Sequence, residues 1–437
     1  MEMELAYEKA FDTMREKVRY RRQKGIFTAL GYTSNLDVLC DFKVDVLNCL
    51  LEQYLKDENL EEMKAPLLIT SMEEFLHAIV YYCVNGIGGE VDIEDFEIIK
   101  STFDTKLGMG GTATQGAMAL AAVKCPSMVH LTDDSREVCE ILKSPQIFTV
   151  SDSEKLIHTD GVKAKAEQEI HYIIQFKKGD VIELGGQKIA IPVSNRLIVT
   201  NITVNETVPF SKSYFHYIEK NAKHVTSVVL SSFNAIQQKK VLNERLDYVK
   251  KHCIKYKQNN EKGIVYFEDA HYHNAEVRKI CLDTIYPHVD IVSMNEEELA
   301  NTLELYDHPI CIDDILSCEE GVRFLIQRFQ IQKGVIVHTK DYSMYAGKKL
   351  EYDIESGLMY GNMMATAKAM NGWYGTEEAI AQVMELPLSE KGVENRKMIS
   401  EKGIENMIVV PSKYMDKPKY TIGLGDSFVA GVQICFT

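Results

Sequence analysis

The sequence predicts an α/β protein with a mainly parallel central sheet that helices cover on both faces. From residue 226 onward, short apolar segments of strand length alternate with long segments of helical spacing. This alternation favours a parallel sheet, because each parallel strand needs a crossover segment, usually a helix, before the next strand. In residues 160–205 the pattern changes, and apolar and polar side chains alternate as they do in half-buried strands.

Individual elements follow from the same patterns. A charged, amphipathic helix is expected over 1–24, a strand over 26–30, and a helix over 71–85 before a glycine-rich break at 86–89. Half-buried strands are expected over 168–177, 181–184, 188–191 and 197–204, with turns at 178–180 and 185–186. Buried strands are expected over 227–231, 263–268, 289–294, 334–338 and 407–410, and long helices over 235–257 and 313–329.

The composition is that of a globular protein with a large core. Of the 437 residues, 45% are hydrophobic and 26% are charged, and the formal net charge is −15. This acidic balance argues against a nucleic-acid partner, and no apolar run approaches the roughly 18–20 residues of a membrane span. The ten cysteines form no CxxC pair, so neither a zinc site nor a disulfide framework is indicated. We expect a cytoplasmic protein, and the sequence does not indicate its oligomeric state.

The most informative segment is a glycine turn before the last predicted helix. Gly423 and Gly425 flank Leu424 and run directly into Asp426, after which small and apolar residues continue at helical spacing. Backbone N–H groups at a helix start lack partners and attract anions such as a phosphoryl group. A carboxylate at that place is useful if it accepts a proton from an attacking hydroxyl. The alternative is an aspartate that only caps the helix.

Three predicted strands end in polar side chains, at the edge of the sheet where ligands bind. Glu268 ends one strand, Asn295 and the glutamates at 296–298 end the next, and His338 with Thr339 ends a third. Oxygen ligands of this type suit Mg²⁺, which neutralises phosphates during transfer. The alternatives are glutamates that complement a helix dipole and a histidine that is a structural hydrogen-bonding residue.

A second glycine-rich turn, Gly110-Gly111-Thr112, runs into a helix of small residues. By itself it is weak evidence, since it also permits close packing of a helix on a sheet, and no Gly-Lys-Ser/Thr follows to make it a P-loop. Asn35 and Asp37, after the first strand, are an amide and a carboxylate of the kind that bind sugar hydroxyls, although both residue types are also common in Asx turns.

Together these motifs resemble, in their order along the chain, the ADP-dependent glucokinase/phosphofructokinase family of the ribokinase-like superfamily. The similarity runs from Gly31 to Gly431. The segments that carry it are 31–37, 110–112, 195–198, 266–268, 295–298, 338–339, 410–411 and 421–426. The last segment is shared widely among ribokinase-like kinases, whereas its combination with Asn-Arg, His-Thr and Val-Pro is much narrower.

The resemblance implies a ribokinase-like large domain that binds the nucleotide and a small β-rich lid that closes over the sugar and excludes water. The large domain would comprise residues 1–40, 106–159 and 206–437, and the sugar-binding lid residues 41–105 and 160–205. The implied partners are a small-molecule sugar and a nucleotide. ADP would be the phosphoryl donor, and Mg²⁺ or another divalent cation the cofactor.

The resemblance also implies a role for each motif residue. Asp426 would be the catalytic base, the N–H groups of Gly423 and Gly425 would stabilise the moving phosphoryl group, and Arg196 would contact the nucleotide phosphates. The metal ligands would be Glu268, Glu296 and Glu298. The nucleotide site would comprise Asn195, Asn295, His338, Thr339, Val410 and Gly425. The sugar site would comprise Asn35, Asp37, Glu90, Gly110, Gly111, Thr112 and His171.

The acceptor stays open between glucose, fructose 6-phosphate and both. Glu90 and His171 resemble sugar-contacting residues of glucose-using members, whereas Lys177, Lys178 and Arg196 could hold a 6-phosphate. Departures from the family pattern occur at Thr33, at Tyr266, and in segments 231–234 and 362–367. Two alternatives are an ATP-dependent ribokinase-like sugar or nucleoside kinase and a catalytically silent sensor of sugar or nucleotide. A sensor need not retain a base together with metal ligands.

Overall fold

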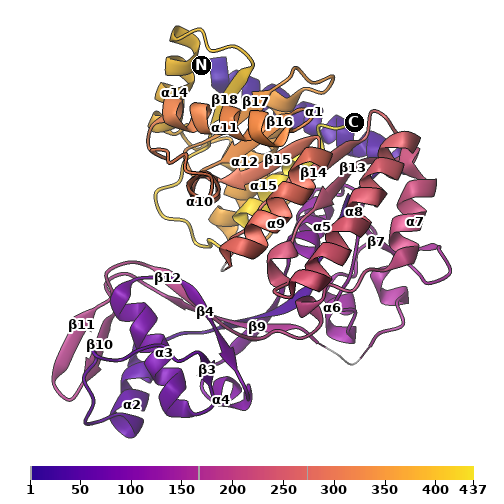
Figure 1. Cartoon of the computed structure of the whole chain (residues 1–437). Coiled ribbons are helices and arrows are strands. Elements are labelled where there is room, and N and C mark those ends of the chain that lie inside the picture. The colour runs from indigo at the N-terminus through magenta and orange to yellow at the C-terminus, as the bar shows by residue number, and fades with distance from the viewer. Residues whose placement is uncertain (1, 166–167, 273) are drawn as a thin grey trace. The chain divides into compact units, whose positions relative to one another are not determined.

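The chain forms two compact units (Figure 1), each of which is described by itself. The computed structural model describes residues 2–165, 168–272 and 274–437. The larger unit comprises residues 1–34, 111–164 and 205–437, and the smaller unit residues 35–110 and 165–204. The lid expected from the sequence comprises residues 41–105 and 160–205. Compared with that expectation, the smaller unit additionally includes Asn35, Asp37 and Gly110.

A ten-stranded sheet forms the centre of the larger unit within the described residues. Its strands are, in spatial order, β18 (Met407–Pro411), β17 (Tyr342–Gly347), β16 (Gly334–His338), β15 (Ile291–Asn295), β14 (Ile264–Glu268), β13 (Val225–Leu230), β1 (Phe27–Leu30), β6 (Ser127–Val129), β7 (Ile147–Val150) and β8 (Leu156–His158). All neighbours from β16 to β7 pair in parallel. The prediction of a mainly parallel sheet is therefore confirmed.

The two edges of this sheet are antiparallel. β8 pairs antiparallel with β7, and β17 pairs antiparallel with both β16 and β18. No strand is predicted at β17, because the turn before it contains none of the glycine or asparagine pairs that mark a hairpin. Instead the Thr339 hydroxyl accepts hydrogen bonds from the N–H groups of Asp341 and Tyr342 and so closes the turn.

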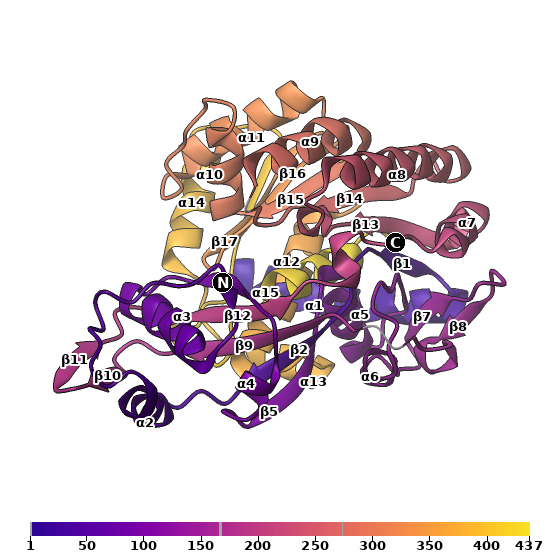
Figure 2. The ribbon, with the colours of Figure 1, turned by 60° about the horizontal axis from the view of Figure 1, so that its bottom comes forward.

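Helices cover both faces of the sheet, as predicted (Figure 2). One face carries α7 (Lys212–Lys220), α8 (Lys239–Asn259), α9 (Ala275–Ile285), α10 (Glu296–Glu304) and α11 (Ile315–Phe329). The other carries α1 (Glu2–Lys24), α5 (Thr112–Ala122), α12 (Ile354–Asn371) and α15 (Leu424–Gln433). The shorter helices α6 (Arg136–Ile141), α13 (Glu377–Val383) and α14 (Glu390–Glu401) complete the unit. The main apolar core lies under the first group and includes the fully buried Leu246, Val292 and Leu325.

Glycines set the distance between α12 and α15, the helix that follows the glycine turn. A Cβ at Gly361 would lie 2.6 Å from the Phe428 ring, and a Cβ at Gly431 would lie 2.6 Å from the Tyr360 carbonyl oxygen. Any side chain at either position would push the two helices apart, because real Cβ contacts of this length do not occur. The position of α15 in the unit is therefore fixed by backbone contact with α12.

The N-terminal helix α1 is fixed by a buried arginine. Arg21 is fully buried, although arginine is rarely buried unless it is paired. Its Nε donates to the Thr437 hydroxyl at 2.8 Å and its Nη1 to the Thr28 hydroxyl at 3.2 Å, while Nη2 donates to the Thr226 hydroxyl. The guanidinium group thus joins α1 to the ends of β1, β13 and the chain.

The smaller unit contains, within the described residues, a six-stranded sheet and a separate hairpin. The sheet order is β3 (Leu68–Ile69), β4 (Gly89–Ile93), β12 (Asn195–Asn201), β9 (Ile170–Phe176), β2 (Asn35–Cys40) and β5 (Thr105–Gly110), and the hairpin is β10 (Val181–Leu184) with β11 (Gln187–Ala190). Its helices are α2 (Val44–Tyr54), α3 (Met72–Asn85) and α4 (Glu97–Lys100). The four half-buried strands predicted in this region are confirmed within a few residues, whereas β2, β4 and β5 are not predicted.

No helix in the described part of the chain is both long and apolar enough to cross a membrane.

Replacing Arg21 with alanine is expected to lower the free energy of unfolding by about 3 kcal/mol, because three threonine hydroxyls lose a charged donor in a buried place. Arg22 is the matched control, since it is the next residue of α1 and is exposed. Arg22→Ala should change the free energy of unfolding by less than about 0.5 kcal/mol. Denaturant unfolding of both variants measures the difference, and equal losses would contradict the role of Arg21.

Candidate active site

Three predicted site residues of the larger unit meet at the carboxyl edge of its sheet. Glu268, Asn295 and His338 end the adjacent parallel strands β14, β15 and β16, and Asn295 is directly paired with His338. Because parallel strands end at the same edge, the side chains come together. The Nε2 atom of His338 lies 3.0 Å from Oε1 of Glu268. His338 therefore has the structural hydrogen bond that the sequence left as an alternative, and its partner is a predicted metal ligand.

Asn295 and Glu298 form a capping box at the start of α10. The Asn295 side chain accepts from the Glu298 N–H at 2.8 Å, and the Glu298 carboxylate accepts from the Asn295 N–H at 2.9 Å. These two bonds satisfy backbone N–H groups that the first turn of a helix leaves without partners. One oxygen of Glu298 is thus engaged in the helix start, a capping role that the sequence analysis does not identify.

The surroundings of the acidic residues at this edge disfavour their charged forms. Burial raises the pKa of Glu268, of Glu296 and of Glu298, and the charges of Asp269 and Glu268 raise the pKa of Glu298 further. The Oε2 atom of Glu268 is buried and has no hydrogen-bond partner among the described residues. A cation would relieve both the repulsion and the unsatisfied oxygen, so these donors fit a hard divalent ion such as Mg²⁺.

The described side chains do not by themselves form a complete metal site. Within residues 2–165, 168–272 and 274–437, no group of three or more His, Cys, Asp or Glu side chains has the spacing that holds a metal ion. Mg²⁺ commonly uses only one or two carboxylates and fills its other positions with water and substrate phosphates. Glu268, Glu296 and Glu298 are therefore compatible with an ion that they bind in part through water.

Behind this acidic edge lies an ion pair that the sequence analysis does not identify. Arg278 of α9 is buried, and its Nη2 lies 3.1 Å from Asp269 Oδ2 and donates to the Glu298 carbonyl at 2.8 Å. The same Nη2 donates to the Thr302 hydroxyl, and the Tyr286 hydroxyl donates to Asp269 at 3.1 Å. The pair joins the end of β14 to the first turn of α10. A lone arginine in an amphipathic helix gives no sign of this role in the sequence.

The predicted glycine turn begins α15. Gly423 has φ of 65° and ψ of 26°, a left-handed conformation that favours glycine. A Cβ there would also lie 2.6 Å from Lys368 Nζ. A Cβ at Gly425 would lie 3.3 Å from Cε1 of His338, so the turn is adjacent to the ends of the strands. The first N–H groups of α15, which has ten residues, begin at this turn, where an anion is favoured.

Asp426 lies in the first turn of α15 and is half-buried. Burial raises the pKa of its carboxyl group, while the charge of Lys368, a hydrogen bond from the Thr112 hydroxyl and the charge of His338 act in the opposite direction. Thr112 begins α5, and its hydroxyl also accepts from the Ser231 hydroxyl at 3.3 Å. The structure thus brings together Asp426 and Thr112, both of which are predicted site residues. The raised pKa of Asp426 suits a carboxylate that accepts a proton.

Two further predicted nucleotide residues have other roles in this structure. The Thr339 hydroxyl closes the turn before β17. It also donates a hydrogen bond to the Tyr342 carbonyl at 3.0 Å. Val410 is fully buried within β18. Asn195, in the smaller unit, donates to the Gly86 carbonyl at 3.4 Å and accepts from the Arg196 N–H at 3.0 Å, so its amide holds the turn before β4.

In the smaller unit, the predicted sugar residues share one face of the sheet. Asp37 is paired with His171, and His171 with Thr200, across β2, β9 and β12. Glu90 is paired with Ile198, two residues from Thr200 along β12. Because side chains two residues apart lie on the same face of a strand, all these residues and Arg196 share that face. The opposite face is apolar, with Val38, Tyr172, Ile174 and Val199 buried.

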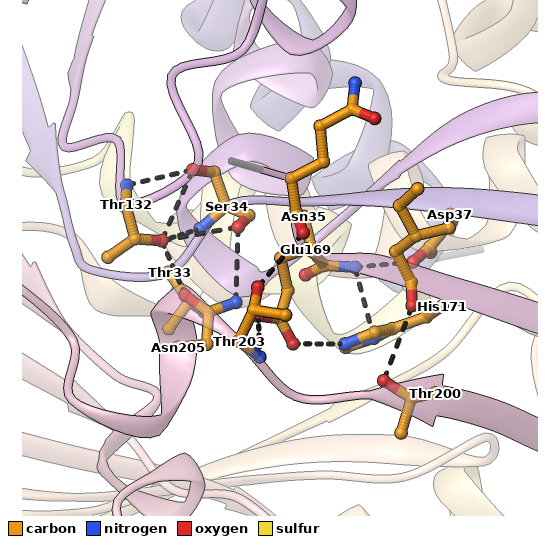
Figure 3. A network of polar contacts seen from close by, with 12 residues as sticks. Thr33, Ser34, Asn35, Asp37, Thr132, Glu169, His171, Thr200, Thr203 and Asn205 are labelled. Atoms are coloured by element: carbon orange, nitrogen blue, oxygen red, sulfur yellow. Dashed lines mark hydrogen bonds and ion pairs between the residues drawn. The ribbon is translucent and has the colours of Figure 1, made fainter. Parts of the chain in front are cut away.

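A chain of hydrogen bonds fixes this polar face (Figure 3). Asn35 Nδ2 donates to Asp37 Oδ1 at 2.7 Å and lies 3.2 Å from His171 Nδ1. His171 Nε2 lies 3.1 Å from Glu169 Oε1, and the other oxygen of Glu169 accepts from the N–H and hydroxyl of Thr203. Glu169 is fully buried and is not predicted as a site residue. The chain orients His171 and Asn35, as ligand-binding side chains require.

The charge state of His171 follows from the same contacts. Burial alone would lower its pKa, but the hydrogen bond to Glu169 and the charges of Asp37, Glu169 and Glu90 outweigh burial and raise the pKa. Burial and then the charge of Glu90 raise the pKa of Asp92, and the charge of Glu90 also raises the pKa of His171. Both influences agree with the common face of Glu90, Asp92 and His171. The face therefore combines carboxylates with a histidine that readily becomes cationic.

Both glycines of the second glycine turn are explained by close contacts. A Cβ at Gly110, which is paired with Asn35 across β2 and β5, would overlap the Asn35 amide and the Asp37 carboxylate. Gly111 has φ of 85°, and a Cβ there would overlap the Thr33 carbonyl group. Gly110 thus makes room for the polar pair in the smaller unit, whereas Gly111 permits the turn into α5 in the larger unit.

Comparison with known proteins gives one decisive match. The residue pattern described as "ADP-specific Phosphofructokinase/Glucokinase conserved region" matches residues 27–433. The chain belongs to the ADP-specific phosphofructokinase/glucokinase family. This family assignment confirms the resemblance that the motifs indicated.

Several members of this family are similar to the chain over nearly its whole length. The ADP-dependent glucose/glucosamine kinase of Pyrococcus abyssi is 25% identical and covers 92% of each chain. The ADP-specific phosphofructokinase of Pyrococcus furiosus is 24% identical, over 95% of this chain and 97% of that protein. Relatives of both substrate types are thus similar to nearly the same degree, so overall identity does not decide the acceptor.

Solved structures of the ADP-specific family show the same fold. The last common ancestor of ADP-dependent phosphofructokinases from Methanosarcinales is 22% identical, with a TM-score of 0.78 over 100% of this chain and 98% of that chain. An ADP-dependent kinase in complex with fructose-6-phosphate and ADPbetaS is 20% identical, with a TM-score of 0.77 over the same shares. The ribokinase-like α/β fold expected from the sequence is therefore confirmed.

The ligand-free protein is expected to lose stability, through Glu298, as the pH rises. A carboxyl group whose pKa is raised on folding binds more protons when folded, so its contribution to the free energy of unfolding falls as pH rises between the two pKa values. For Glu298 that interval runs from 4.5 to about 8. Thermal unfolding of Glu298→Gln should therefore show a Tm that exceeds the wild-type Tm by an amount that grows over this interval.

Glu304→Gln, on the exposed side of the same helix, is the control and should give no such growing difference. A Tm difference between Glu298→Gln and the wild type that stays constant with pH would contradict a raised pKa at Glu298.

Proposed function

We propose that this protein transfers a phosphoryl group from ADP to a hexose, giving AMP and a hexose phosphate. The observation that carries the proposal is the junction of Asp426, Thr112 and the Gly423 turn at the carboxyl edge of the large sheet. It places a carboxylate beside a ready-made anion site, which suits a reaction between a hydroxyl and a phosphoryl group. Membership of the ADP-specific family supports ADP as the donor.

In the proposed reaction, Asp426 accepts the proton of the attacking sugar hydroxyl as its oxygen forms a bond to the phosphorus of the terminal phosphate of ADP. The bond from that phosphorus to the bridging oxygen breaks, and AMP leaves with the electron pair. The N–H groups of Gly423, Gly425 and Asp426 stabilise the negative charge on the moving group. Thr112, whose hydroxyl favours the ionised form of Asp426, is proposed to orient that carboxylate.

Glu268, Glu296 and Glu298 are the proposed holders of a divalent cation. The unsatisfied Oε2 of Glu268 and the raised pKa values of the three carboxyl groups support this assignment. A bound Mg²⁺ supplies charge neutralisation at the nucleotide phosphates. His338, through its bond to Glu268, holds that carboxylate in place.

The remaining nucleotide contacts are proposals that rest on the family motifs. Arg196 is proposed at the nucleotide phosphates. Asn195, Asn295, Thr339 and Val410 are proposed around the nucleotide, although each already has a structural role or is buried, so backbone atoms would supply much of their contact. The protein is proposed to act in the cytoplasm.

Glucose is the acceptor that we propose first. Asn35, Asp37, Glu90 and His171 share one polar face, and their amide, carboxylate and imidazole groups suit the hydroxyls of a neutral sugar. The carboxylates on this face would repel a second phosphate group. Gly110, Gly111 and Thr112 are proposed to complete the sugar site.

Fructose 6-phosphate is the second candidate acceptor, alone or in addition to glucose. Arg196 lies on the same face as His171, and Lys106 of β5 lies on it as well, since it is paired with Leu39 two residues from Asp37. Either cation could pair with a 6-phosphate. Lys177 and Lys178 are exposed between β9 and β10, which agrees with their alternative as turn residues.

Activity with ADP and ATP, each combined with glucose, fructose 6-phosphate or a nucleoside in the presence of Mg²⁺, tests the proposal. We expect AMP to form with ADP and glucose. Turnover with fructose 6-phosphate instead would keep the ADP-dependent hexose kinase and change its acceptor. Turnover with ATP alone would favour a ribokinase-type kinase, and ligand binding without any turnover would favour a silent sensor.

Asp426→Ala is expected to reduce kcat by at least about 10²-fold, the usual contribution of a positioned general base. The affinity for ADP, measured by calorimetric titration, should stay within severalfold, because the N–H groups of the turn are unchanged. Asp416→Ala, an exposed aspartate ten residues earlier, should retain wild-type kcat. An Asp426→Ala variant that keeps most of its rate would show that the base is another residue.

A further inference from the structure

We infer that Lys368 is a positioning residue that holds the glycine turn and the first turn of α5 in register with Asp426. Nothing in the family motifs assigns a role to this lysine. The inference rests on the proposed phosphoryl transfer for its kinetic consequence, whereas the structural consequence can be measured without any activity. The feature that carries it is a buried ammonium group at the point where three helices of the larger unit meet.

Lys368 lies on α12 and is only 2% exposed. Its Nζ donates to Gln115 Oε1 of α5 at 2.6 Å and to the Gly423 carbonyl at 3.3 Å. Gln115 is three residues after Thr112, and Gly423 three residues before Asp426. One ammonium group therefore connects the two helix starts that carry Thr112 and Asp426.

Two aromatic rings lie beside this ammonium group. Nζ lies 4.1 Å from the centroid of the Tyr374 ring and 5.8 Å from that of Tyr420. The Tyr374 hydroxyl donates to the same Gln115 oxygen that accepts from Lys368. The lysine is thus held by cation–π contacts and a shared acceptor, so its position is fixed.

Burying a cation at this place costs free energy, so its presence indicates a role that a neutral residue could not fill. The residues of α12 next to Lys368, Ala367 and Ala369, are small and apolar, and a buried ammonium loses its hydration. The Gly423 carbonyl also accepts from the Ser427 hydroxyl at 3.1 Å, so the turn is closed without Lys368. What Lys368 adds is the link to α5 and a positive charge near the carboxylate of Asp426.

That charge acts on Asp426, the proposed base. Lys368 favours the ionised form of Asp426 and so lowers the pKa that burial raises. The other groups that face Asp426 are Thr112 of α5, His338 of β16 and Glu268 of β14. Lys368 belongs to α12, and the contacts described above link it to Gln115 of α5, to the Gly423 carbonyl and to the rings of Tyr374 and Tyr420.

The chain offers a matched control in Lys413. This lysine is 3% exposed, its Nζ donates to the carbonyls of Met384 and Leu386 at 2.9 Å each, and it lies 5.6 Å from the centroid of the Tyr7 ring. Like Lys368, it is a buried ammonium group that donates to carbonyl oxygens beside a tyrosine ring, although both of its acceptors are backbone carbonyls. Among the described residues, its side chain makes no hydrogen bond, ion pair or cation–π contact with α5 or with the turn at 423–426.

The test compares Lys368→Met and Lys413→Met in the full-length chain. Hydrogen–deuterium exchange should show that Lys368→Met raises the exchange rate of the backbone amides at 112–116 and 423–427 by at least tenfold, because the link between the two helix starts is lost. In Lys413→Met these amides should exchange as in the wild type. Lys368→Arg, which keeps the charge, should restore part of the protection.

The kinetic comparison adds a readout that loss of stability would not produce. In Lys368→Met, kcat should fall by about 10–100-fold, while KM for the sugar and the affinity for AMP change by less than about threefold. Lys413→Met should leave kcat unchanged at a temperature where both variants are folded. A kcat loss shared equally by both variants would overturn the inference.

The two proposals can fail separately. If the wild type shows no turnover with any donor and acceptor, the proposed function fails, but the exchange measurement still decides the position of Lys368. If Lys368→Met leaves exchange at 112–116 and 423–427 unchanged, Lys368 does not hold the turn, whatever the activity.

Discussion

The turn at Gly423 is the constraint on which the rest of the candidate active site depends. Its left-handed backbone favours glycine, and a Cβ there would lie 2.6 Å from Lys368 Nζ and 2.8 Å from Gln115 Oε1. Because α15 begins there, the turn determines where the helix directs its first N–H groups and where Asp426 is placed. The glycines between α12 and α15 then keep that helix close to α12. Strand ends, turn and base are thereby kept within one rigid part of the larger unit.

Most of the fold can be predicted from the sequence, for reasons that individual elements show. The strands that end at Glu268 and His338 are short and continuously apolar, as buried parallel strands must be, and they begin and end within a few residues of their predicted limits. β17 escapes prediction because its hairpin turn is closed by the Thr339 hydroxyl, a side-chain contact that no turn motif records. β2 and β5 escape because their polar face interrupts the apolar pattern.

The candidate site can be predicted from the sequence only where its residues belong to short motifs. Asp426, Glu268 and the glycine turns stand out because each belongs to a short local pattern, namely a carboxylate directly after a glycine turn, a carboxylate at the end of a buried strand, or adjacent glycines before a helix. Lys368, Arg278 and Glu169 do not, since each acts through partners far away in the sequence and a single buried charge leaves no local pattern. The lone lysine in the small-residue segment of α12 is the one signal that could have indicated Lys368.

Two departures from the family pattern prove to be neighbours. The Thr33 hydroxyl donates to the Ser232 hydroxyl at 2.7 Å, and Ser232 has φ of 74°, in the left-handed region that favours glycine. Serine at such a position costs roughly 1 kcal/mol or more. The backbone at 231–234 thus keeps a conformation typical of glycine although serine stands there, and the bond to Thr33 offsets part of that cost.

The central claim is that the terminal phosphoryl group of ADP moves directly to a hexose. ADP labelled with ³²P in its terminal phosphate, incubated with the protein, Mg²⁺ and glucose, tests it most directly. The account predicts that the label appears in a hexose phosphate in a one-to-one ratio with unlabelled AMP. Label released as inorganic phosphate, or retained in ADP while the same protein labels the sugar from ATP, would contradict it.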